Sequence, residues 1–66
     1  MKNQLRVFRA QRGWSQAQLA DLAGVARQTI IALEGDKYAP SLTLAFKLAK
    51  LFNTTVEQLF QPDVHD

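Results

Sequence analysis

Few residue types that commonly carry catalysis occur in this chain of 66 residues, and those that do occur are scattered. The only histidine is His65, near the C-terminal end, and there is no cysteine. Ser15 and Ser41 each precede a helical pattern, where a serine hydroxyl caps the first turn. The sequence has no glycine-rich phosphate loop and no group of carboxylates, so we expect a protein that is not an enzyme and uses no metal or cofactor.

The remaining chemistry is charge, which is unevenly distributed. All eight lysines and arginines lie in residues 1–50 beside three acids, a net charge of +5, whereas residues 51–66 carry three acids and a net charge of −3. Four of the cations fall within the first twelve residues: Lys2, Arg6, Arg9 and Arg12. This division is typical either of an ordinary solvated surface or of a body that binds a polyanion and has an acidic tail. Charge alone leaves both interpretations open.

Length and composition limit the fold. A chain this short supports one domain with one core, so residues 1–66 are predicted to form a single unit. No apolar stretch approaches the ~20 residues that span a membrane, and the lack of cysteine fits a reducing setting. We therefore expect a cytoplasmic protein with no membrane segment, stabilised only by the packing of its secondary structure.

Helix start and stop signals predict five short helices. Asn3, Ser15, Ser41 and Thr55 are candidate caps, and the predicted stops are Gly13, Gly24, Gly35 and Asn53. Residues 15–18 and 55–58 have the spacing of a capping box. No segment alternates with period two for long enough to indicate a strand, and residues 62–66 are expected to form a flexible tail. The predicted fold class is all-α, a compact five-helix bundle.

Two of these helices and the turn between them form a tighter unit over about residues 16–35. An apolar set spans both helices, and Gly24 permits the sharp turn of a helix-turn-helix. Ile30, Leu33 and Glu34 share one face of the third helix, so the opposite face holds four other residues: Arg27, Gln28, Ile31 and Ala32. The fourth helix, residues 42–52, is polar only along a narrow stripe and is predicted to be the most buried.

The sequence resembles the phage repressor/Cro type of helix-turn-helix regulator, also called the XRE family. The resemblance rests on residues 9–20 (RAQRGWSQAQLA), 24–30 (GVARQTI) and 33–34 (LE). Residues 38–42 (YAPSL), 45–49 (AFKLA) and 51–52 (LF) resemble a branch of very small members. The resemblance implies a lambda-repressor-like bundle whose third helix reads bases in the major groove.

The resemblance also implies roles for individual residues. Arg27 and Gln28 become the main base readers, because Arg pairs with guanine and Gln with adenine through two hydrogen bonds each. Ile31 and Ala32 lie on the same reading face, where Ile31 is either a stray surface residue or a contact to a thymine methyl or a partner subunit. The expected phosphate contacts are Gln16, Thr29 and Lys37.

Two charged residues fall on inward helix faces, and the resemblance implies that they pair. Arg9 and Glu34 are therefore expected to form a structural salt bridge rather than to contact DNA. The sequence departs from the family at Ala26, where a Ser or Thr usually caps the recognition helix, and at residues 34–36, where Glu-Gly-Asp replaces Glu-Asn-Gly.

The resulting hypothesis is a sequence-specific regulator of transcription, a repressor, that binds a palindromic operator in double-stranded DNA as a homodimer. The expected dimer surface lies around Leu59, Phe60 and Val64, unless Leu59 and Phe60 close the core. No small-molecule effector is expected. The alternatives are a helix-turn-helix module that binds proteins and the antitoxin component of a toxin–antitoxin pair.

Overall fold

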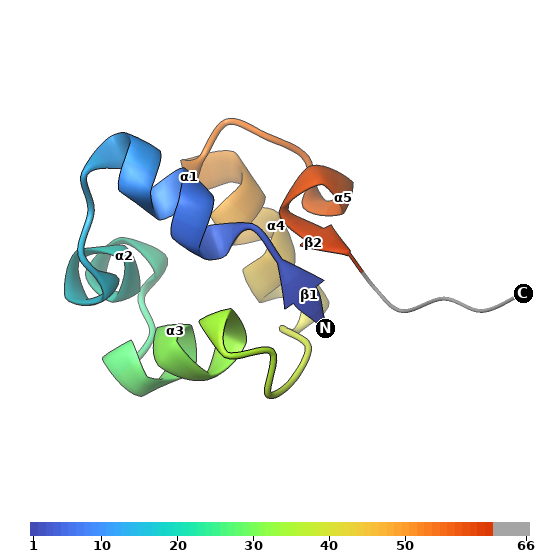
Figure 1. Cartoon of the computed structure of the whole chain (residues 1–66), viewed down its shortest axis with the longest axis horizontal. Coiled ribbons are helices and arrows are strands. Elements are labelled where there is room, and N and C mark those ends of the chain that lie inside the picture. The colour runs from blue at the N-terminus through green and yellow to red at the C-terminus, as the bar shows by residue number, and fades with distance from the viewer. Residues whose placement is uncertain (62–66) are drawn as a thin grey trace, which may run out of the picture.

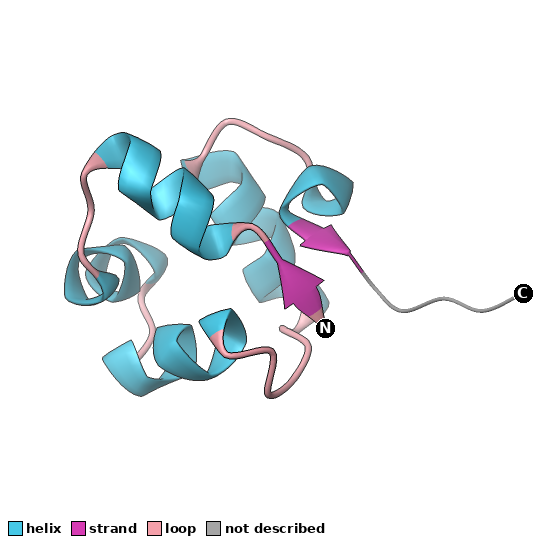
Figure 2. Ribbon diagram, viewed as in Figure 1, coloured by secondary structure: helices cyan, strands magenta, loops and turns pink. Residues whose placement is uncertain are grey.

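The computed structural model describes residues 1–61, and residues 62–66 lie outside the described part. The elements follow the order β1 (Lys2–Asn3), α1 (Leu5–Arg12), α2 (Gln16–Ala23), α3 (Arg27–Glu34), α4 (Leu42–Leu51), α5 (Val56–Leu59) and β2 (Phe60–Gln61). The helices pack around a common centre, and both strands lie at one end of the molecule (Figures 1 and 2). The five predicted helices are confirmed. The predictions for Val64, His65 and the tail fall outside the described residues.

Most predicted helix caps form. Ser15 completes a capping box, since its hydroxyl accepts from the Gln18 N–H while Oε1 of Gln18 accepts from the Ser15 N–H. The box predicted at 55–58 forms only in part: Thr55 caps Gln58, but the Gln58 side chain accepts from the Thr54 hydroxyl instead. Asn3 precedes the N-cap residue of α1 by one position, and its Oδ1 still accepts from the N–H of Leu5 at 3.1 Å.

The predicted stop at Gly35 differs in conformation from the other two glycines. Gly13 and Gly24 adopt the left-handed region, with φ of 68° and 72°. Gly35 has φ −84°, and the left-handed residue is the next one, Asp36, with φ 59°. Helix α3 therefore ends at Glu34, as predicted, but the left-handed residue that follows it is Asp36 and not the glycine.

The prediction that the chain forms no strand is wrong, because β1 and β2 form a short antiparallel pair. Lys2 lies opposite Gln61 and Asn3 opposite Phe60, and the N–H of Gln4 donates to the carbonyl of Leu59 at 2.8 Å. Each strand has two residues, too few for an alternating pattern to be visible in the sequence. The pair joins the start of the described chain to its end.

One apolar core connects all five helices. Its fully buried side chains are Leu5, Leu19, Ile30, Leu33, Leu48 and Leu59. Ala20 and Ala23 are also buried, and their small side chains let α2 cross closely over its neighbours. Phe52 packs its ring 5.6 Å from Phe8 and 5.3 Å from Trp14, extending the core under the end of α1.

Two expectations about burial are wrong. Helix α4 is exposed over more than its predicted polar stripe: it buries Ala45, Leu48 and Ala49, but Leu42 and Phe46, one turn apart, are 70% and 60% exposed. Leu59 and Phe60 are 0% and 3% exposed, so they close the core and cannot form the expected dimer surface. An apolar residue in a short helix does not reveal by its type alone which face the fold will cover.

Candidate nucleic-acid interface

Helix α3 presents a mixed polar and apolar face to solvent. Ile30 and Leu33 fix the helix to the core, which leaves Arg27 and Gln28 exposed and Ile31 41% exposed. Thr29 and Ala32 lie half-buried at the borders of this face. The structure thus brings together the four residues expected to read bases, with Ala32 the least prominent. We call Arg27, Gln28, Ile31 and Ala32 the reading face.

The turn between α2 and α3 sets the direction of that face. Gly24 has a positive φ, and the N–H of Val25 donates to the carbonyl of Ala20 at 3.0 Å, which closes the end of α2. A Cβ added at Gly24 would meet only Nζ of the Lys47 side chain, at 3.3 Å, so it is the positive φ that favours glycine at this turn. Ala26 occupies the N-cap of α3 without a side-chain hydrogen bond, leaving the first turn of the helix uncapped.

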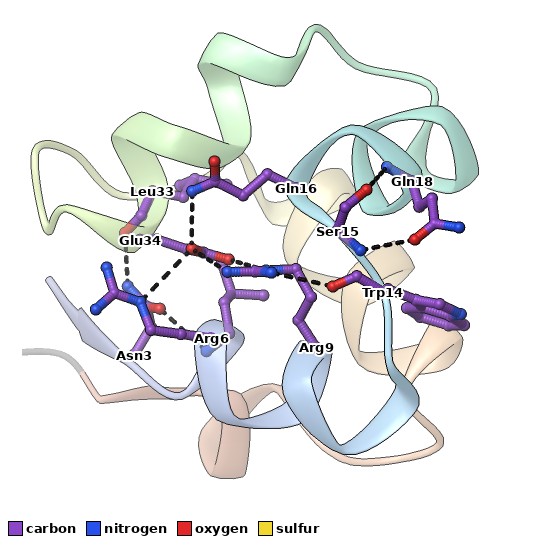
Figure 3. A network of polar contacts seen from close by, with 10 residues as sticks. Asn3, Arg6, Arg9, Trp14, Ser15, Gln16, Gln18, Leu33 and Glu34 are labelled. Carbon is purple, nitrogen blue, oxygen red and sulfur yellow. Dashed lines mark hydrogen bonds and ion pairs between the residues drawn. The ribbon is translucent and has the colours of Figure 1, made fainter.

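An ion pair between α1 and α3 fixes the C-terminal end of α3, opposite the turn (Figure 3). Nε and Nη2 of Arg9 donate to the two carboxylate oxygens of Glu34 at 2.8 Å and 3.1 Å. Nη1 of Arg9 donates to the carbonyl of Trp14 at 3.0 Å. The Glu34 side chain is 1% exposed and that of Arg9 17%. The structure therefore brings together the two residues expected to pair.

Gln16 belongs to the same network. Its Nε2 donates to Oε1 of Glu34 at 3.2 Å, so the side chain that opens α2 is tied to the end of α3 (Figure 3). Burial by itself raises the pKa of Glu34, but hydrogen bonds from Arg9 and Gln16, together with the charges of Arg9 and Arg6, leave that pKa below its usual value. The hydrogen bond to Glu34 raises the pKa of Arg9, against the effect of burial. Both residues of the pair are therefore ionised at neutral pH.

A basic hollow lies beside this network, at the start of α2. Its volume is about 520 Å³, and it is lined by Arg6, Arg9, Ser15, Gln16, Ala17 and Arg27. The first N–H groups of a helix have no acceptor within the helix, and the helix dipole adds partial positive charge there. The hollow thus combines three arginines with helical N–H donors, which suits an anion.

Sequence reasoning missed two residues of this region. Arg6 is 75% exposed, with Nε 3.9 Å from Oε1 of Glu34, and its position one turn before Arg9 could have indicated it. Nδ2 of Asn3 donates to the carbonyl of Leu33 at 2.6 Å and to Oδ1 of Asp36 at 3.2 Å, fastening the end of α3 to β1. No sequence signal connects Asn3 to partners 30 residues away.

Lys37 follows the end of α3. Its N–H donates to the carbonyl of Ala32 at 3.0 Å, while its side chain is exposed. The left-handed Asp36 directs the chain into this position. Lys37 therefore stands at the opposite end of α3 from Arg27.

Residues 1–61 contain no group of three histidine, cysteine or acidic side chains that could hold a metal ion. In the same part of the chain, no helix has the length and apolar character needed to cross a membrane.

Comparison with known proteins identifies this arrangement. Residues 5–59 match the family model described as helix-turn-helix. The chain belongs to the Cro/C1-type (XRE) helix-turn-helix family. An uncharacterised HTH-type transcriptional regulator of Methanocaldococcus jannaschii is 53% identical over 60 residues, which cover 91% of each chain. The chain is also 38% identical over 56 residues to the competence pilus inhibition repressor of Acinetobacter baylyi, covering 85% of this chain and 51% of that protein.

A solved structure supports the same assignment. The restriction-modification controller protein C.AhdI from Aeromonas hydrophila is similar with a TM-score of 0.76 and 34% identity, over 85% of each chain. The lambda-repressor-like helical fold is thereby confirmed. The family and its named relatives are transcriptional regulators rather than enzymes.

Proposed function

We propose that this chain is a sequence-specific regulator of transcription that inserts α3 into the major groove of double-stranded DNA. The observation that carries the proposal is the reading face itself, where Arg27, Gln28 and Ile31 stand exposed on a helix fixed by the core. Arg27 pairs with guanine and Gln28 with adenine, while Ile31 packs against a thymine methyl. Ala32 adds little readout, because its side chain is one methyl and half-buried.

The phosphate contacts flank this face. The basic hollow at the start of α2 offers Gln16, its neighbouring N–H groups and Arg6 to one phosphate. Lys37 reaches a second phosphate beyond the other end of α3, and Thr29 contacts the backbone from the border of the reading face. Because Glu34 holds Gln16 by a hydrogen bond, the ion pair also orients this phosphate ligand.

A single α3 of eight residues reads few bases, so we infer a homodimer on a palindromic operator. Two recognition helices related by a twofold axis then enter major grooves about 34 Å apart, one turn of B-DNA. The name of the Acinetobacter relative favours repression over activation. The protein acts in the cytoplasm, where its operator lies, and needs no small-molecule effector.

Selection from a random pool of DNA duplexes tests this proposal, with affinity for the selected site measured at two salt concentrations. We expect enrichment of a palindrome and a steep loss of affinity with salt, because each phosphate contact displaces counterions. No enrichment together with a flat salt response would contradict DNA binding and favour a module that binds protein.

A further inference from the structure

Helices α1 to α4 end in the same kind of turn, but the turn after α3 differs in its left-handed residue. The residues at positive φ in the four turns are Gly13, Gly24, Asp36 and Asn53. In each turn the following residue donates its N–H to the carbonyl five residues earlier, at 2.9 or 3.0 Å. Glycine is the usual residue at such a position, and asparagine is the next. Asp36 is neither, so its turn depends more on contacts from outside.

The side chain of Asn3 supplies those contacts. Its Nδ2 donates to the carbonyl of Leu33 at 2.6 Å (Figure 3) and to Oδ1 of Asp36 at 3.2 Å. Its Oδ1 accepts from the N–H of Leu5 at 3.1 Å, which sets the orientation of the amide. A carboxamide combines donor hydrogens and an acceptor in one planar group, so a single side chain can make all of these bonds. Asn3 thus bonds the turn at two points, a backbone carbonyl and the carboxylate of the left-handed residue.

Asn3 is itself held firmly by the strand pair. It lies opposite Phe60, and the N–H of the next residue, Gln4, donates to the carbonyl of Leu59 at 2.8 Å. Leu59 and Phe60 are 0% and 3% exposed, so this side of β1 is attached to the core. Residues 35–37, in contrast, are all exposed. The exposed turn is therefore tied to the core through one side chain.

We propose that Asn3 is a positioning residue for DNA binding: it holds the turn at Asp36 and so fixes the direction in which Lys37 leaves α3. The proposal rests on the proposed function, in which Lys37 binds a phosphate. The N–H of Lys37 donates to the carbonyl of Ala32 within the same turn, so opening the turn releases the backbone of Lys37 as well as its side chain. A ligand group that is held in place before binding loses less freedom on binding. Asn3 therefore strengthens a phosphate contact that it does not itself make.

Amide hydrogen exchange of the full chain without DNA, followed by NMR, tests the turn directly. The readout is the exchange rate of the Lys37 N–H divided by that of the Trp14 N–H, which makes the same bond at the end of α1. Global destabilisation raises both rates, so a change in their ratio reports local opening after α3. We expect the ratio to rise about tenfold in Asn3→Ala. In the control Gln61→Ala, which shortens an exposed amide side chain of the same strand pair, it should stay within about threefold of wild type.

Two further variants separate the turn from the bond to Leu5. Asn3→Asp keeps the oxygen that accepts from Leu5 but has no donor for the turn, so its ratio should rise at least as far as that of Asn3→Ala. Glycine takes a φ of 59° without strain, so in an Asp36→Gly background Asn3→Ala should change the ratio less than about threefold. The proposal would be overturned by an Asn3→Ala or Asn3→Asp ratio equal to that of wild type, or by an equally large effect of Asn3→Ala in both backgrounds.

The salt dependence of affinity for a random duplex connects the turn to DNA. Lys37→Ala should lower the slope of log affinity against log salt by about one. Asn3→Ala changes no charge, so it should lower the slope only by releasing Lys37: we expect a similar loss, and no further loss in the double variant. A slope that falls in Lys37→Ala but not in Asn3→Ala supports the proposed function and overturns the role of Asn3. A wild-type chain that binds no duplex contradicts the proposed function, and the role of Asn3 in DNA binding with it.

Discussion

Glu34→Gln tests the ion pair at the centre of the fold, because it removes a charge while nearly preserving shape. The carboxylate is 1% exposed and accepts hydrogen bonds from Arg9 and Gln16. A glutamine keeps one acceptor oxygen but turns an NH₂ group toward a guanidinium that donates only. The variant therefore leaves the Arg9 charge without its counter-ion in a site where water reaches only 17% of that side chain.

Breaking one side of a buried pair costs about 3–5 kcal/mol. The partial exposure of Arg9 and its remaining bond to the Trp14 carbonyl place this variant near 3 kcal/mol. A domain of 66 residues has a total stability of roughly 3–10 kcal/mol. Since 1 kcal/mol moves the Tm of such a domain by about 4–8 °C, we expect Tm to fall by about 12–24 °C.

Thermal melts followed by circular dichroism measure this loss, with Glu57→Gln as the control. Glu57 is exposed and forms no ion pair among residues 1–61, so its variant should melt within about 2 °C of wild type. Replacing the pair together, as Arg9→Leu with Glu34→Leu, should cost clearly less than the sum of the two single changes. A Glu34→Gln protein that melts with the wild type would refute this reasoning.

Three further predictions follow from the same geometry. Lys37→Ala should weaken binding to selected and random duplexes equally and reduce the salt slope by about one; a loss confined to the selected site would instead make Lys37 a base reader. Ala26→Ser should supply the missing cap of α3 and raise the free energy of unfolding by about 1 kcal/mol in urea titrations; no gain would mean that the N-terminal N–H groups of α3 are already satisfied. The pKa of Glu34 in the folded protein lies below its usual value of about 4.5. The ionised Glu34 therefore contributes its full stabilisation of the fold above about pH 4.5, and this stabilisation is lost as the pH falls through the folded pKa. Wild type should therefore lose more stability than Glu34→Gln between about pH 6 and pH 3, and parallel losses would contradict this.

The helices and the residues of the reading face could be predicted because local rules determine them. Capping by Ser15 and the left-handed Gly24 depend on neighbours in the chain, and a helical period separates Arg27 and Gln28 from Ile30 and Leu33. The family resemblance supplied the pairing of Arg9 with Glu34, which charge and position suggested only in part.

Features that depend on distant segments could not be predicted. The strand pair forms because the fold brings residues 2–3 beside residues 60–61, and Asn3 meets α3 for the same reason. Leu42 and Leu48 are the same residue type on one helix, yet one is 70% exposed and the other fully buried. Only the placement of the other helices decides which face is covered.

The central claim is that α3 reads sequence through Arg27. Its most direct test is the ratio of affinities for the selected operator and a random duplex, measured by fluorescence anisotropy for wild type and Arg27→Ala at equal salt. Loss of a bidentate pair to guanine costs about 1–3 kcal/mol of discrimination per copy, so we expect the ratio to fall at least about fivefold, while affinity for random DNA changes much less. An unchanged ratio, with both affinities reduced equally, would contradict the claim.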